Sequence, residues 1–208
     1  MATPPTTPGE RQLQDELGTR TRADHFSATQ VLDHLNEDMQ AFVARQDLCF
    51  LSTAGAAGEC DCSLRAGPVG FVQVLGPGTV AYPEYRGNGV MASLGNIRET
   101  GRVGLLFVDF VRDVIGLHVN GRARVVTDEL LRADVPGLAA DPHPGRHPVV
   151  WVVVDVEEAY VHCSKHIPLL VPLPKQQHWG TDDHKRKGGD FFRAAEGRLT
   201  SAGTPYAD

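Results

Sequence analysis

Hydrophobic residues in the middle of the chain alternate with polar residues in short runs, and Gly- and Pro-containing turns separate the runs. In one such run, Cys60, Cys62 and Leu64 alternate with Asp61 and Ser63. Alternation with a period of two is typical of a strand with two different faces. The pattern predicts six or seven strands, over residues 48–53, 59–64, 71–75, 79–82, 102–110, 114–126 and 149–156. In the longest strand, Gly116 and Gly121 predict bends or bulges.

Helical spacing is confined to three places. Hydrophobic residues recur at steps of three and four from Ser27, a possible N-cap, to about Gln46, and they predict the first helix. A short helix is predicted over 91–99, with Gly101 as its stop. A third is predicted over 128–133. The apolar positions of the first helix are Val31, Leu32, Leu35, Met39 and Phe42.

Many short strands with few helices predict a mainly β fold. We expect an antiparallel barrel with an N-terminal helix and short connecting helices, and an open sandwich is the alternative. Strands do not alternate regularly with long helices, so a doubly wound parallel sheet is disfavoured. We expect a flexible arm over 1–26, rich in Pro, Thr and charge, and a single domain over 27–165. The extension over 166–208 is expected to wrap over the site or a partner subunit.

Composition narrows the range of partners. The 208-residue chain has a formal net charge of −6 and a pI of about 5.8, which disfavours nucleic acids and anionic membranes as partners. It contains no apolar run of 18 residues, and its first residues lack the pattern of a signal peptide. We therefore expect a cytoplasmic protein, in which Cys49, Cys60, Cys62 and Cys163 are free thiols.

The loop between two predicted elements, Tyr85-Arg86-Gly87-Asn88-Gly89, has the chemistry of a phosphate site. Arg86 offers a bidentate fork, and Gly87 and Gly89 let backbone N–H groups approach a ligand. Asn88 adds a donor, and the following helix points its positive end at the loop, with Ser93 in its first turn. An ordinary turn with a solvated arginine is an equal alternative, because the spacings of the known nucleotide loops are absent.

Other polar groups give weaker signals. Ser63 and Arg65 share a strand face and could bind a heteroaromatic ring or its phosphate, although a surface arginine is the simpler interpretation. Lys165 and His166 could present polar groups to a ligand edge. A zinc site from cysteines and histidines is disfavoured by their spacing, and no GxSxG motif supports a serine hydrolase. A haem iron held by one of the nine histidines has no motif in its favour.

Several of these segments, taken in order, resemble the pyridoxamine 5′-phosphate oxidase-like family. The resemblance covers about residues 29–165 and implies the FMN-binding split-barrel fold. It also implies a homodimer with FMN in a cleft shared by both subunits. It is carried by Tyr82-Pro83, Arg86-Gly87-Asn88, Leu94-Gly95-Asn96-Ile97, Arg102-Val103-Gly104-Leu105-Leu106-Phe107 and Val119-Asn120-Gly121-Arg122-Ala123.

The resemblance also implies roles for residues. Arg86 and Asn88 match the loop that holds the FMN phosphate, and Tyr82 and Pro83 match the strand end beside the ribityl chain. Ser63, Arg65, Phe71 and Val72 fall on strands that line the flavin. The tail from Cys163 to Trp179, with Lys165 and His166, corresponds to the segment that closes the partner's site.

The phosphate loop lacks the Arg-Lys pair of true pyridoxamine phosphate oxidases, and the tail is arranged differently, so oxidation of vitamin B6 is not expected. The implied function is an FMN-dependent oxidoreductase that acts on a small organic substrate, with NAD(P)H as a candidate electron donor. The alternatives are a non-catalytic binder or sensor of flavin or haem, and an empty structural dimer. Some relatives bind deazaflavin or haem instead of FMN. Because the cofactor carries the redox chemistry, the protein needs no acid–base pair of its own.

Overall fold

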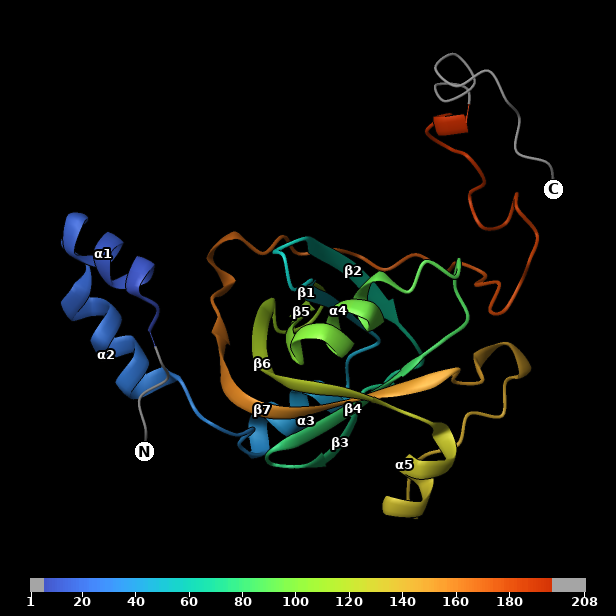
Figure 1. The fold of residues 1–208 in the computed structure, drawn as a ribbon, viewed down its shortest axis with the longest axis horizontal. Coiled ribbons are helices and arrows are strands. Elements are labelled where there is room, and N and C mark those ends of the chain that lie inside the picture. Colours follow the sequence, from blue (N-terminus) through green and yellow to red (C-terminus); the bar gives the residue numbers. More distant parts are fainter. Residues whose placement is uncertain (1–5, 196–208) are drawn as a thin grey trace.

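The computed structural model describes residues 6–195, and the predictions for 1–5 and 196–208 lie outside this range. Seven antiparallel strands form one sheet in the order β2-β1-β5-β6-β7-β4-β3 (Figure 1). The strands are β1 (Leu48–Ala54), β2 (Cys60–Ala66), β3 (Gln73–Gly76), β4 (Thr79–Glu84), β5 (Arg102–Asp109), β6 (Ile115–Val126) and β7 (Val150–His162). The helices are α1 (Pro8–Glu16), α2 (Arg20–Gln30), α3 (Glu37–Ala44), α4 (Ala92–Thr100) and α5 (Asp128–Asp134), with short 3₁₀ turns η1 (Pro144–Arg146) and η2 (Ser164–His166).

The sheet curls around its hydrophobic core but does not close, because its edge strands β2 and β3 are not paired with each other. Inward-facing residues such as Leu51, Phe107 and Val154 are fully buried. Helix α4 packs against β1, β2, β5 and β6 on the hollow side of the sheet (Figure 1). The antiparallel split barrel predicted from the sequence is confirmed, and the single sheet excludes the open sandwich.

Two glycines shape the strands that frame the site. Gly101 ends α4 in a left-handed conformation (φ 62°), as its position in the sequence predicts. At Gly121 the register of β6 against β7 shifts by one residue, which confirms the predicted bulge. A Cβ atom at Gly121 would lie 2.1 Å from the carbonyl oxygen of Asp155, so only glycine fits there. Gly116, in contrast, stays in regular register, so no bulge forms there.

The predicted helix from Ser27 to Gln46 is wrong. Helix α2 ends at Gln30, and α3 begins only after Asn36, whose side chain accepts a hydrogen bond from the N–H of Met39. Between them the chain is extended, because Leu32 pairs with Ala159 of β7 and the N–H of Leu35 donates to the carbonyl of Pro77. Tertiary pairing therefore overrides the helical spacing of these apolar residues.

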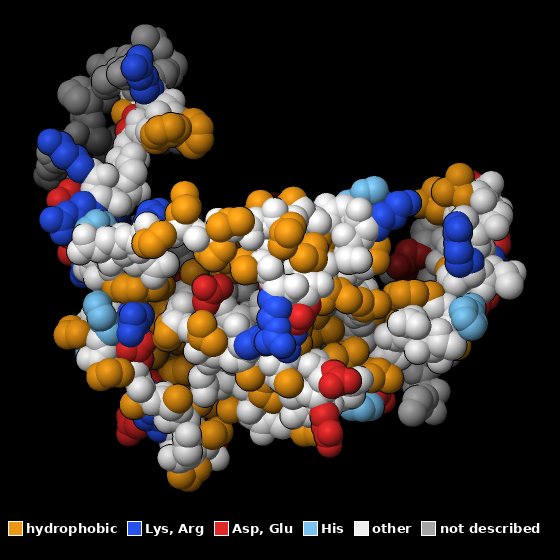
Figure 2. Space-filling model, turned by 180° about the vertical axis from the view of Figure 1, so that it is seen from behind, with side chains coloured by type: hydrophobic (Ala, Val, Ile, Leu, Met, Phe, Trp, Pro, Cys, Tyr) orange, Lys and Arg blue, Asp and Glu red, His pale blue; other side chains and the backbone are white. Residues whose placement is uncertain are grey.

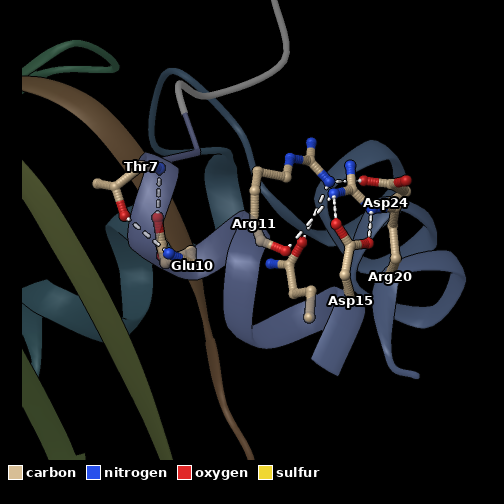
Figure 3. Close-up of polar contacts among 7 residues, drawn as sticks. Thr7, Glu10, Arg11, Asp15, Arg20 and Asp24 are labelled. Carbon is tan, nitrogen blue, oxygen red and sulfur yellow. Dashed lines mark hydrogen bonds and ion pairs between the residues drawn. The ribbon is translucent and has the colours of Figure 1, made fainter. Parts of the chain in front are cut away.

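The predicted N-terminal arm contains helices α1 and α2, which form a hairpin. Thr7 and Glu10 make a reciprocal capping box at the start of α1. Ion pairs of Arg11 with Asp24 and of Arg20 with Asp15 join the two helices (Figure 3). Neither helix has a buried residue, so polar contacts rather than a core shape the hairpin, and its flexibility stays a prediction.

A hollow separates this hairpin from the barrel (Figure 2). Phe26 of α2 crosses it and packs edge-to-face on Tyr160 of β7, with ring centroids 6.1 Å apart.

Among the described helices, none is both long and apolar enough to cross a membrane.

Strand β7 is longer than predicted, because its second half pairs with β6 up to His162. Its outer face carries a second, smaller hydrophobic cluster beside α5. Trp151 and Val153 pack there with Leu131 and Leu138. This cluster fixes α5 and the loop that follows it to the outside of the barrel.

The bulge at Gly121 predicts opposite effects for two Gly→Ala substitutions. Gly121→Ala should lower the free energy of unfolding by about 1–3 kcal/mol, because its Cβ collides with backbone. Gly95→Ala, at an open position inside α4, should raise it by about 0.5–1 kcal/mol. Urea denaturation measures both values. Equal effects of the two variants would contradict the role given to the bulge.

Candidate functional site

Strand β4 leads into the glycine-rich loop, which turns the chain into α4. Gly89 has a positive φ of 83°, and the Oδ1 of Asn88 accepts a hydrogen bond from the N–H of Val90 at 3.0 Å. Met91, the N-cap, has a left-handed backbone (φ 56°) and provides no side-chain cap. Backbone strain of this kind concentrates at functional sites. The first N–H groups of α4 are therefore free of a side-chain cap, beside a loop that glycine keeps open.

This loop and α4 border a cavity of about 560 Å³ whose other wall is β2. A cavity of this size is typical of small-molecule sites, which span about 300–1,000 Å³. Its polar side chains form one network. Ser93 donates a hydrogen bond to Asp61 at 2.5 Å, and Ser63 donates to the same oxygen at 3.1 Å. The guanidinium of Arg65 donates to Ser93 at 3.3 Å and to Glu84 at 2.9 Å.

The Arg65–Glu84 ion pair spans the open seam of the barrel, because it joins edge strand β2 to β4, which do not pair. Both side chains are only about 15% exposed. Burial raises the pKa of Glu84, and the positive charge of Arg65 opposes that rise. Arg65 thus offsets part of the cost that burial imposes on the charged carboxylate of Glu84.

Beneath this pair lie two buried groups of the barrel interior. Burial raises the pKa of the Cys49 thiol to about 12 and also raises the pKa of Tyr82, and the charge of Arg65 lowers both. The hydroxyl of Tyr82 is buried without a hydrogen-bond partner among the described residues. An unpaired buried hydroxyl is costly, and this one lies in the barrel core and does not line the cavity.

The structure brings part of the predicted site together. Six of the predicted residues line the cavity: Ser63, Arg65, Gly87, Asn88, Ser93 and Trp179.

The other predicted residues lie elsewhere. Phe71 and Pro83 line a second cavity, and Val72 and Tyr82 are buried in the barrel core. Arg86 does not line the cavity and pairs with Asp182 of the tail at 2.8 Å. Lys165 and His166 lie exposed in η2 and line neither of these two cavities.

The C-terminal tail returns to the same chain's cavity. After β7 it runs past the side where β1 and β2 lie, and it reaches the loop that follows β4 (Figure 1). There Trp179 packs edge-to-face on Tyr85, with ring centroids 5.6 Å apart. The guanidinium of Arg146 lies 5.6 Å from the centroid of the Trp179 ring. The tail thereby supplies one wall of the cavity.

Sequence reasoning missed the acidic members of the site. Asp61 shares the two-residue alternation of Ser63 and Arg65, so the strand pattern could have placed it on the same face. Glu84 and Tyr85 lie at the end of β4, and no local pattern relates them to Arg65 or Trp179. Only the fold brings those pairs together.

Replacement of Arg65 should leave Glu84 buried and unpaired. We expect Arg65→Met to lower the free energy of unfolding by roughly 2–3 kcal/mol at neutral pH. The pKa of Glu84 is already raised above 4.5 in the folded protein, and loss of Arg65 raises it further. Ionisation of Glu84 therefore opposes folding, so the deficit relative to wild type should grow as pH rises from about 5 to about 8.

Urea denaturation at both pH values measures this deficit. The double variant Arg65→Met/Glu84→Gln is the control, because it removes the buried charge together with its partner. It should be more stable than Arg65→Met at the higher pH. A deficit in Arg65→Met that is the same at both pH values would show that the pair is not the source.

No curated protein matches this chain. Among solved structures, HupZ from Group A Streptococcus is 20% identical, with 61% of this chain and 93% of that chain covered and a TM-score of 0.44. An FMN-binding protein from Syntrophomonas wolfei is 13% identical, with 73% and 95% covered and a TM-score of 0.44. A candidate pyridoxamine 5′-phosphate oxidase from Lactobacillus delbrueckii is 22% identical, with 64% and 99% covered and a TM-score of 0.46.

The sequence model of one family, described as pyridoxamine 5′-phosphate oxidase, matches residues 35–163. The match takes in all seven strands, α4 and the glycine-rich loop, and it spans well over half of the 208 residues. The chain belongs to the pyridoxamine 5′-phosphate oxidase family.

Proposed function

We propose that this protein is an FMN-dependent oxidoreductase that acts on a small organic substrate and takes electrons from NAD(P)H. The observation that carries the proposal is the cavity of about 560 Å³ between β2 and α4, which the glycine-rich loop and an uncapped helix N-terminus border. Free N–H groups and the helix dipole favour a phosphate at that point.

The charges around the cavity support a phosphate on the loop side. Asp61 and Glu84 would repel an anion, and Arg65 is already engaged by Glu84. Arg86 is adjacent to Gly87 of the cavity wall, and its pair with Asp182 is exposed, so that pair contributes about 0–1 kcal/mol. We therefore expect Arg86 to exchange Asp182 for the phosphate, because the phosphate carries more negative charge than one carboxylate and can bind the guanidinium with two oxygens.

FMN, when bound, supplies the redox chemistry, and the protein has to hold it and keep water away. Ser63, Ser93 and Arg65 offer polar contacts along one wall, and Trp179 shields the opposite side. None of the described residues that line this cavity is a histidine, so the cavity offers no imidazole ligand to a haem iron. This favours a flavin, or a phosphate-bearing deazaflavin, over haem.

We also propose that the protein is a homodimer. Leu64, Val90 and Met91 line the cavity and are exposed on its mouth in the single chain. Apolar side chains gathered around a ligand site are typical of surfaces that a partner covers. A second copy of the chain would bury them and close the site.

The visible spectrum of the purified protein tests the cofactor. We expect the absorption bands of oxidised flavin, either as purified or after addition of FMN, and bleaching by NADH or NADPH. Deazaflavin and haem give different spectra. A flavin binder without activity would not be bleached by NADH or NADPH. A colourless protein that FMN does not reconstitute would overturn the proposal.

Variants in the same titration test how the phosphate is held. Arg86→Ala should weaken FMN binding by about 1.5–3 kcal/mol and leave riboflavin, which lacks the phosphate, almost unaffected. Asp182→Ala should strengthen FMN binding by up to about 1 kcal/mol, because it frees Arg86. The neighbouring Asp183→Ala is the control and should change neither affinity. A loss of riboflavin binding equal to that of FMN would remove Arg86 from the phosphate site.

Sedimentation tests the dimer. We expect a dimer at micromolar concentration, and Val90→Asp should shift it towards monomer, because a charge would be buried without a partner. Val111→Asp, at an exposed apolar position that does not line the cavity, is the matched control. A monomeric wild type, or equal effects of both variants, would contradict the proposed interface.

A further inference from the structure

A second cavity of about 610 Å³ lies on the outer side of β4, and Tyr85 borders both this cavity and the one beside α4. Its floor is formed by the ends of β4 and β7, and its outer wall is formed by α5 and the loop over 139–148. The smaller hydrophobic cluster around Trp151 and Leu131 anchors that wall. The cavity is therefore held between fixed elements of the barrel and a segment inserted between β6 and β7.

Aromatic residues and prolines make up seven of the seventeen residues that line this cavity. Trp151 and Phe71 are each only 3% exposed, so they are held rigidly by the packing around them. Proline and aromatic walls lose little conformational freedom when a ligand binds, which favours flat apolar molecules. The aromatic and proline residues at the surface are Pro68, Phe71, Pro83, Tyr85, Pro142, Pro148 and Trp151.

The charged residues of the cavity neutralise one another. Asp128 accepts hydrogen bonds from the guanidinium of Arg132 at 2.8 Å and from the indole N–H of Trp151 at 2.7 Å. Arg146 makes two hydrogen bonds to the carboxylate of Asp141. Both aspartates have a lowered pKa, in each case first because of the arginine that donates to them. An ionic ligand would therefore find no unpaired opposite charge among these four side chains.

We propose that this second cavity binds the ring system of a neutral, flat, largely apolar organic molecule, and that such molecules are the substrate class of the enzyme. The role as substrate rests on the proposed function, whereas the binding itself does not. The position supports the role, because Tyr85 alone among the aromatic side chains of this wall also borders the cavity beside α4. A ring bound here would lie across Tyr85 from the proposed flavin cavity.

The two tryptophans of the chain report on the two cavities separately. Trp151 lines the second cavity and donates its indole N–H to Asp128, whereas Trp179 lines the cavity beside α4. In ¹⁵N-labelled protein the two indole N–H groups give two signals, and Trp179→Phe assigns them. A ligand in the second cavity should shift the signal of Trp151 more than that of Trp179, which meets this cavity only through Tyr85 and Arg146.

Three matched probes test the predicted chemistry: 2-naphthamide, which is neutral, 2-naphthoate and 2-naphthylmethylammonium. We expect saturable binding of the neutral probe with a shift of the Trp151 signal. The two ions should bind at least about tenfold more weakly than the neutral probe, because neither finds an unpaired counter-charge. Equal affinity for all three probes, or a neutral probe that leaves Trp151 unchanged, would overturn the proposal.

Two variants locate the binding. Ala140 is exposed and lines the cavity, so Ala140→Phe should fill it and lower the affinity for 2-naphthamide at least about tenfold. Ala133→Phe, at an exposed position of α5 outside the cavity, is the control and should bind like wild type. Equal effects of both variants would contradict the location.

The same variants separate this proposal from the proposed function. FMN affinity should be unchanged in Ala140→Phe. If Ala140→Phe weakens FMN as much as 2-naphthamide, the second cavity belongs to the cofactor and the substrate proposal fails. If wild type binds 2-naphthamide at Trp151 but never binds FMN, the cavity proposal stands and the proposed function fails.

Discussion

The largely buried ion pair between Arg65 and Glu84 is the interaction on which the rest of the site depends. A curled sheet with unpaired edges leaves a seam, and backbone hydrogen bonds do not cross it. This pair does cross it, from β2 to β4, and the hydrogen bond from Arg65 to Ser93 ties α4 to the same point. A split barrel can thus keep an accessible cavity at its seam without losing the relative position of its walls.

The pair also sets the electrostatics of the site. Glu84 neutralises Arg65, the arginine that the sequence would assign to a ligand. The carboxylates of Asp61 and Glu84 both line the cavity. A phosphate is then favoured only on the loop side, where α4 begins and Arg86 is tied to the tail by an exposed pair. The second cavity favours a neutral ligand, because its aspartates pair with its arginines within the wall. Two adjacent cavities therefore differ in the charge of the ligand that each would accept.

Local chemistry explains which parts of the fold the sequence could predict. The strands, the stop at Gly101 and the bulge at Gly121 follow from alternation and from glycine's conformational freedom, which neighbouring residues determine. The first helix was predicted wrongly, because Leu32 and Leu35 satisfy their backbone groups with Ala159 and Pro77, which are distant in sequence. The family was predicted correctly, because its loop and strands lie in one continuous stretch.

Only part of the candidate site was predictable, for the same reason. Ser63, Arg65 and the loop residues lie where a strand face and a turn place them. The partner of Arg86 is 96 residues away, and the partner of Arg65 is on a strand that does not pair with its own. Such contacts form only in the folded chain, and no spacing in the sequence encodes them.

The central claim is that the N-terminus of α4 and its glycine-rich loop hold the phosphate of FMN. Amide chemical shifts of ¹⁵N-labelled protein, compared between saturating FMN and saturating riboflavin, test it most directly. The phosphate-dependent shifts should be largest for the backbone N–H groups of residues 89–93. Phosphate-dependent shifts that centre on any other segment, or none at all, would contradict the account.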